Sequence, residues 1–168
     1  MRLLKTITNQ DFGLEENFDR DKIPERSAAR AVILNEKNEV CIIPVTRGNY
    51  HKIPGGGVEE GEDPKAAVYR EAREEAGADI EIVGEIGYIL EFREDNIQYS
   101  YCFLAKTIGE PGSLNHTQEE IDDGFQQPVW LPIDKAIEEF KDDKCTFLRA
   151  KFMSLRDRTF LEEAQKLL

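Results

Sequence analysis

The sequence has few cysteines, few histidines and no long apolar run, and each scarcity argues against a class of function. Its 168 residues include three cysteines and two histidines, and no two cysteines form a CxxC pair. So few thiols argue against a disulfide-stapled fold and a structural zinc site, and they favour a reduced, cytoplasmic setting. No apolar stretch approaches the ~20 residues of a membrane helix. The first residues are too polar for a secretory signal, so we expect no membrane partner.

Basic residues are also scarce relative to acidic ones. The chain has 22 lysines and arginines against 34 aspartates and glutamates, which gives a formal net charge of -12. Binding to a nucleic-acid polymer depends on clustered positive charge, so this composition argues against such a partner. It does not exclude a small phosphorylated ligand, because a bound divalent cation can reverse the field locally.

The remaining composition is that of one globular domain, because 40% of the residues are hydrophobic, 33% are charged and no repeat or linker divides the chain. The order of expected elements favours a mixed α/β sandwich over a regular parallel sheet. We expect residues 1–27 to form an N-terminal arm and residues 141–168 to contain a C-terminal helix. The expected elements are an edge strand at 3–7, a hairpin at 29–45, a helix from 64, strands at 80–94 and 97–108, a polar loop at 109–127, a strand at 129–132, and helices at 133–140 and 147–167.

Residues 53–79, IPGGGVEEGEDPKAAVYREAREEAGAD, combine a glycine-rich loop with the clearest helix of the chain. Asp63 is a suitable N-cap, Pro64 fits the first helical turn, and Gly77 is placed to end the helix. An apolar stripe along this helix suits packing against a sheet. The stripe consists of Val68, Ala72 and Ala76.

Three carboxylates, Glu71, Glu74 and Glu75, fall within an arc of roughly 100° beside that stripe. Like charges so close together destabilise a helix unless a positive partner neutralises them. One interpretation is an acidic face that only contacts water. The glycines favour another, because positive φ angles and close backbone approach let carbonyl groups join the carboxylates around a cation. Such hard oxygen ligands suit Mg²⁺ or Mn²⁺.

The same stretch resembles the Nudix box, in which Gly is followed by five spacers, Glu, seven spacers and the segment Arg-Glu-aliphatic-x-Glu-Glu-x-Gly-aliphatic. Ala72 and Ala78 stand at the aliphatic positions and are smaller than the usual Leu, Ile or Val. The resemblance implies a Nudix-type α/β/α sandwich with a mixed sheet, in a single domain over residues 1–168. The fixed positions are all filled, by Gly56, Glu62, Arg70, Glu71, Glu74, Glu75 and Gly77.

The resemblance implies an enzyme that hydrolyses a diphosphate bond in a nucleoside diphosphate linked to another group. It also implies a divalent metal cofactor, Mg²⁺ or in its place Mn²⁺. By position, Glu71 and Glu75 would be metal ligands, and Glu74 would be a ligand or a bridge to a second ion. The carbonyl of Gly55 or Gly56 would complete the set of ligands.

Catalytic groups are less sharply indicated than the metal ligands. Arg70 is expected to hold the loop against the helix and orient Glu71. The general base would come from the box helix or from the acidic segment HTQEEIDDG, where Glu119 and Glu120 are candidates. We favour Glu120, because such segments carry a glutamate shortly before a W-x-P-x-D motif.

Substrate contacts are expected just before the glycines. Arg47, Tyr50 and Lys52 are candidates to bind phosphate or to stack on a base, with an ordinary surface role as the alternative. The substrate is open between a nucleoside triphosphate, a nucleotide sugar and a similar small diphosphate, and a homodimer is also left open. Two other functions are considered, a non-catalytic nucleotide sensor on the same fold and an acidic interaction domain. The complete set of box glutamates argues against both.

Overall fold

The computed structural model describes all 168 residues, which form an eight-stranded sheet and four α-helices. No helix combines the length and the hydropathy needed to cross a membrane. The strands are β1 (Leu3–Ile7), β2 (Glu25–Leu34), β3 (Glu39–Val45), β4 (Tyr50–Lys52), β5 (Gly55–Gly57), β6 (Asp79–Phe92), β7 (Ile97–Ile108) and β8 (Val129–Pro132), and the helices are α1 (Pro64–Ala76), α2 (Gln118–Asp123), α3 (Ile133–Lys141) and α4 (Leu148–Gln165).

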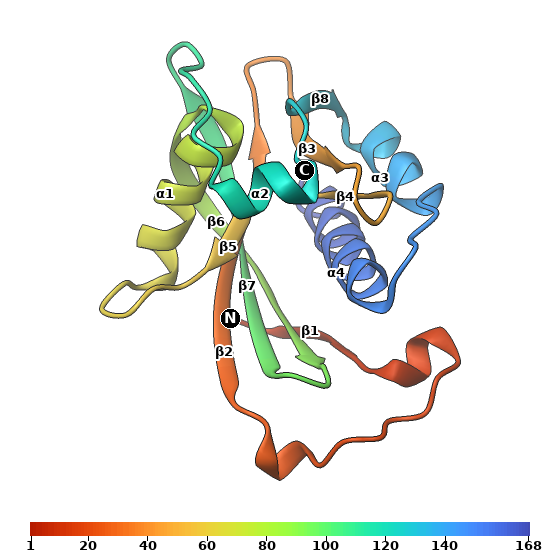
Figure 1. Cartoon of the computed structure of the whole chain (residues 1–168). Coiled ribbons are helices and arrows are strands. Elements are labelled where there is room, and N and C mark those ends of the chain that lie inside the picture. Colours follow the sequence, from red (N-terminus) through yellow and green to blue (C-terminus); the bar gives the residue numbers. More distant parts are fainter.

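The sheet is mixed, with α1 on one face and α3 and α4 on the other (Figure 1). Its strand order is β1-β6-β7-β2-β3-β4, with β5 against β2 and β8 against β3. Strands β1 and β6 pair in parallel, as do β2 and β7, whereas β6 and β7 are antiparallel. These layers confirm the predicted α/β/α sandwich with a mixed sheet.

Strand β2 separates the two halves of the core, because successive side chains of a strand point to opposite faces. Ala29, Ala31 and Ile33 pack in the cluster that contains the apolar stripe of α1. Val32 and Leu34 point the other way, into the larger cluster formed with α3 and α4. The small residues on the α1 side let that helix approach the sheet closely.

The segment predicted as a hairpin, 29–45, pairs as one only beside its turn. The pairing of β2 with β3 is confined to Leu34 and Val40. Beyond that point β2 continues along β5, and β3 continues along β8 and β4. The glycines of β5 occupy the edge of β2 that a longer hairpin would use, so the two strands diverge. Residues of both β2 and β4 line the cavity described below.

Helix α1 begins and ends where its sequence predicts. The side chain of Asp63 accepts hydrogen bonds from the backbone N–H groups of Lys65 and Ala66 at 2.8 and 2.9 Å, which satisfies two free donors of the first turn. Gly77 ends the helix in the left-handed conformation, with φ of 61°. The edge strand at 3–7 is also confirmed, while β2 begins at Glu25, inside the range expected for the N-terminal arm.

The polar loop expected at 109–127 contains the short helix α2. The cause is a capping box, because Thr117 caps the helix and Glu120 reaches back to the backbone N–H of Thr117 at 2.9 Å. The loop is fixed to the end of α1, where the N–H of Gly112 donates to the carbonyl of Gly77 at 2.5 Å and the N–H of Asn115 donates to that of Glu74 at 2.8 Å. These bonds bring α2 beside α1.

A methyl group at Gly77 should weaken this attachment. A Cβ there would lie 2.6 Å from the carbonyl oxygen of Gly112, in addition to the strain of a left-handed alanine. We expect Gly77→Ala to lower the free energy of unfolding by about 2 kcal/mol or more, measured by urea denaturation. Gly109→Ala is the matched control, since Gly109 has φ of 67° and no atom within 4 Å of the added carbon. Equal losses in the two variants would show that the contact with Gly112 contributes nothing.

Candidate active site

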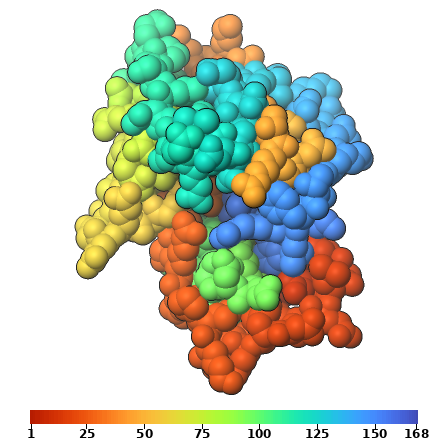
Figure 2. Space-filling model, in the orientation of Figure 1, coloured from red at the N-terminus to blue at the C-terminus, as the bar shows by residue number.

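A cavity of about 270 Å³ lies between α1, α2, β5 and the N-terminal part of α4. On the face shown in Figure 2, the surface is hollowed between α2 (teal), the start of β2 (orange) and the start of α4 (blue). Acidic side chains lie on one part of its wall and arginines on another. The lining residues are Arg26, Arg30, Tyr50, Lys52, Gly55, Gly56, Gly57, Glu71, Glu75, Arg93, Gln98, Thr117, Glu119, Glu120, Asp123, Phe125, Arg149, Met153 and Arg156.

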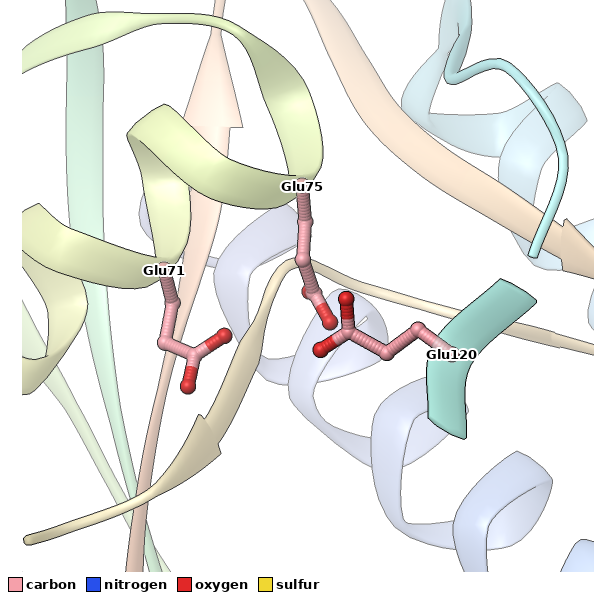
Figure 3. Close-up of side chains that lie close together, drawn as sticks. All are labelled: Glu71, Glu75 and Glu120. Atoms are coloured by element: carbon pink, nitrogen blue, oxygen red, sulfur yellow. The ribbon is translucent and has the colours of Figure 1, made fainter. Parts of the chain in front are cut away.

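The acidic part of the wall is a cluster of three carboxylates, which we call the carboxylate cluster. Glu71 and Glu75 project from α1 toward Glu120, which comes from α2 (Figure 3). One oxygen of each side chain lies within 4.8 Å of an oxygen of the other two. Two of the three carboxylates lie four residues apart on one helix, and the third is 45 residues further along the chain.

The carboxylate of Glu71 is buried and only partly hydrogen-bonded. Glu71 is 5% exposed, its Oε1 accepts a hydrogen bond from Arg70 Nη1 at 2.7 Å, and its buried Oε2 has no partner. Burial, and then the negative charge of Glu75, raises the pKa of Glu71. The backbone passes so close that a Cβ at Gly56 would lie 2.2 Å from Glu71 Oε1, so a side chain there would displace the Glu71 carboxylate.

Glu75 has a positive partner of its own. Lys52 Nζ donates to Glu75 Oε1 at 2.5 Å, and both side chains are almost fully buried. The N–H of Gly55 donates to Glu75 Oε2 at 2.8 Å. The carbonyl of Gly55, expected as a metal ligand, accepts hydrogen bonds from Lys52 Nζ at 3.0 Å and Arg30 Nη1 at 2.9 Å. The ammonium group of Lys52 thus neutralises part of the cluster's charge.

Arg70 clamps the glycine-rich loop onto α1, as its position in the motif led us to expect. Its guanidinium donates to both carboxylate oxygens of Glu62 at 3.0 Å and to the carbonyl of Gly57 at 3.0 Å. The hydrogen bonds from Arg70 lower the pKa of Glu62. The same guanidinium lies 3.3 Å from Glu74, whose carboxylate is outside the carboxylate cluster. The third carboxylate of the cluster is therefore Glu120, whereas the motif had led us to expect Glu74 beside Glu71 and Glu75.

The other predicted residues divide between the cavity and the outer surface. Tyr50 and Lys52 both line the cavity, and burial raises the pKa of the Tyr50 hydroxyl to about 12. Glu119 lines it as well, outside the carboxylate cluster. Arg47 does not line it, and its Nη1 pairs with Asp123 at 3.0 Å on the surface.

Sequence analysis missed the arginines of the cavity wall. Arg30 stands inside an apolar strand, and Arg156 lies four residues from Phe152 and four from Phe160, on the buried face of α4. Charged residues are almost never fully buried unless they are paired, so an arginine in such a periodic apolar pattern is a usable signal.

The carboxylate cluster fits a divalent cation. Three carboxylates that converge, one with a buried oxygen that lacks any partner, form the oxygen-rich set that Mg²⁺ or Mn²⁺ prefers. Glu71, Glu75 and Glu120 would hold the ion. When bound, such an ion neutralises phosphate charge and lowers the pKa of a coordinated water.

Comparison with known proteins agrees with this site. A family model described as the NUDIX domain matches residues 24–151, most of the chain and the whole of the glycine-rich loop and α1. The chain belongs to the Nudix hydrolase family. It is accordingly a pyrophosphohydrolase.

Individual relatives of this Nudix hydrolase are distant. An RNA pyrophosphohydrolase from Ruthia magnifica subsp. Calyptogena magnifica is 25% identical over 131 residues, covering 67% of this chain and 73% of that protein. The human diphosphoinositol polyphosphate phosphohydrolase NUDT4B is 26% identical over 121 residues, covering 71% and 64%. The MutT protein from Methanosarcina mazei Go1 has a similar fold, with a TM-score of 0.61, 18% identity and coverage of 87% of this chain and 96% of that one.

Removing the charge of Glu71 should stabilise the Nudix fold in the absence of metal. The raised pKa means that the ionised form is disfavoured in the folded protein, so the cost is present at pH 7 and vanishes as the pH falls below ~4. We expect Glu71→Gln to raise the melting temperature in EDTA at pH 7.5 by about 2–4 °C, the shift that ~1 kcal/mol produces in a chain of this size.

The same variant should lose the response to metal. Addition of Mn²⁺ should raise the melting temperature of the parent protein and leave that of Glu71→Gln unchanged, because ligands of the native state stabilise it. Glu60→Gln is the control, since Glu60 is exposed and does not line the cavity. A lower melting temperature of Glu71→Gln in EDTA would contradict the electrostatic account of Glu71.

Proposed function

We propose that this protein catalyses the divalent-metal-dependent hydrolysis of a diphosphate bond in a small nucleoside diphosphate derivative. The observation that carries the proposal is the convergence of Glu71, Glu75 and Glu120 around a buried oxygen that has no partner. A cation there would offset the repulsion between an acidic protein and an anionic substrate. The names of the two relatives refer to different substrates, an RNA and a diphosphoinositol polyphosphate. The proposal therefore names a class of substrate and no individual molecule.

The protein's own residues would divide the work as follows. Glu71 and Glu75 would hold the cation, and Arg70 keeps Glu71 in place through its hydrogen bond. Lys52 Nζ, which bridges Glu75 and the carbonyl of Gly55, turns to a phosphate oxygen of the substrate. The oxygen of a water molecule attacks phosphorus, the bond to the bridging oxygen breaks, and Glu120 accepts the proton of the water.

Glu120 has two roles open to it, since a carboxylate in the cluster can hold the metal or accept the proton. Glu119 is the neighbouring alternative for the base, because it also lines the cavity. Glu74 is kept as a ligand that could join when a second ion binds, after its contact with Arg70 is released. The three free cysteines are consistent with a reducing, cytoplasmic setting, which we propose as well.

Replacing Glu75 should lower turnover strongly, and because it also removes the ion-pair partner of the buried Lys52, circular dichroism must show that the variant is folded. Loss of a charged ligand removes several kcal/mol of charge stabilisation, so we expect Glu75→Gln to lower kcat/KM by at least ~100-fold with Mg²⁺. Phosphate release from a panel of nucleoside triphosphates, nucleotide sugars and dinucleotides measures this, with EDTA as the negative control and Glu60→Gln as the matched variant. Nucleotide binding without any turnover in the parent protein would instead support a sensor.

Variants of Glu120 and Glu119 should separate the two roles of the acidic segment. If Glu120 is the base, Glu120→Gln lowers kcat by about 10²–10⁴-fold and leaves Mn²⁺ affinity near the parent value. We expect Glu119→Gln to change kcat less than tenfold. A large loss of Mn²⁺ affinity in Glu120→Gln would assign that residue to the metal, and a large loss of kcat in Glu119→Gln would move the base there.

A further inference from the structure

The wall of the cavity away from the carboxylate cluster contains three buried guanidinium groups. Arg30 and Arg93 are each 6% exposed, and Arg156 is 0% exposed. They face two buried carboxylates, Glu91 and Asp157, both 0% exposed. Arg156 lies 2.6 Å from Asp157 and 3.5 Å from Glu91, so these five groups form one connected network. Three positive charges against two negative ones give these five groups a net charge of +1.

Hydrogen bonding in this network is incomplete on the arginine side. Arg156 donates through Nε to Asp157, but its buried Nη1 and Nη2 have no hydrogen-bond partner. The buried Nε atoms of Arg30 and Arg93 also lack partners. A buried donor without an acceptor is costly, and a guanidinium more so than a neutral group. All three arginines line the cavity, so a ligand there could supply the missing acceptors.

The two carboxylates do not satisfy these donors, because the nearest carboxylate oxygens lie 3.5 Å from Arg156 Nη1 and 3.7 Å from Arg30 Nε, without hydrogen-bond geometry. Asp157 Oδ2 accepts a hydrogen bond from the N–H of Ile53 at 3.0 Å. Glu91 Oε2 accepts from Gln98 Nε2 and from Ser100 Oγ, each at 2.9 Å. These bonds hold both carboxylates in position behind the arginines. The open donors are therefore a fixed feature of the wall.

The lowered pKa of Arg30 also favours an anion in the cavity. Burial, and then the positive charge of Arg156, lowers the pKa of Arg30 to about 10. The group is still protonated at neutral pH, so the network carries its unbalanced charge under ordinary conditions. An anion in the cavity would relieve the repulsion between the two guanidinium groups.

The composition of the cavity favours a phosphate group beside the arginines. Only three of its 19 lining residues are hydrophobic, and five are arginines. Guanidinium forks match the oxygens of phosphate in pairs. Two further arginines, Arg26 and Arg149, also line the cavity, and the side chain of Arg149 is 45% exposed.

We propose that Arg30, Arg93 and Arg156 form a metal-independent anion subsite for a phosphate group of the substrate other than the diphosphate that is cleaved. The subsite adjoins the carboxylate cluster through Gly55, whose carbonyl accepts from Arg30 and whose N–H donates to Glu75. The inference rests on the proposed function, and it narrows the substrate to a molecule with at least one phosphate group beyond the cleaved pair.

Binding of inorganic tripolyphosphate in EDTA tests the subsite without any catalysis. We expect isothermal titration at 150 mM KCl to detect binding to the parent protein and to Glu71→Gln. Arg156→Lys keeps the charge and loses the fork, so its affinity should fall at least tenfold, since a hydrogen bond to a charged group is worth that much. Arg149→Gln should weaken binding several-fold. Arg158→Gln, two residues further along α4 and outside this cavity, should have no effect.

Absence of tripolyphosphate binding in EDTA, or equal affinity in all variants, would overturn the subsite even if metal-dependent hydrolysis is found. Conversely, intact binding without hydrolysis would refute the proposed function and leave the subsite standing. Circular dichroism checks that Arg156→Lys is folded. If that variant is unfolded, the test compares the tripolyphosphate affinities of Arg149→Gln and Arg158→Gln, and equal affinities would overturn the subsite.

Discussion

The backbone of Gly55 joins the acidic and the basic parts of the cavity. Its N–H donates to Glu75, while its carbonyl accepts from Lys52 and Arg30. The backbone there has φ of +147°, and a Cβ would lie 2.4 Å from the carbonyl oxygen of Ala29. A glycine is thus required both by the conformation and by the close approach to β2. Gly55 therefore fixes the separation between the carboxylate of Glu75 and the guanidinium of Arg30.

Local signals in the sequence were sufficient to predict α1 and the Nudix box that it carries. The N-cap Asp63, the following Pro64 and the terminal Gly77 are short-range features, so they act the same way whatever the rest of the chain does. The same reasoning covers the alternating strands β6 and β7. The divergence of β2 from β3 was not predictable in this way, because it depends on β5, a competitor for the same edge that lies beyond β4 in the chain.

The composition of the site depended even more on tertiary contacts. Glu120 joins the carboxylate cluster because the loop before α2 is attached to the end of α1, a contact that no local pattern encodes. Arg30 and Arg156 were missed for a different reason. Each lies within a periodic apolar segment, and such periodicity by itself predicts core positions, although a charge at a core position requires either a partner or a function.

The ion pair of Lys52 with Glu75 has a consequence for the life of the protein in a cell. A chain that relied on its cofactor to neutralise buried carboxylates would unfold when the cofactor ran short, and proteases would remove it. Here an internal ammonium group stands in as counter-ion. The polypeptide can therefore accumulate in its folded form without a bound ion. Under the proposed metal dependence, a change in ion supply would alter how much of the pool is active while the size of the pool stays the same.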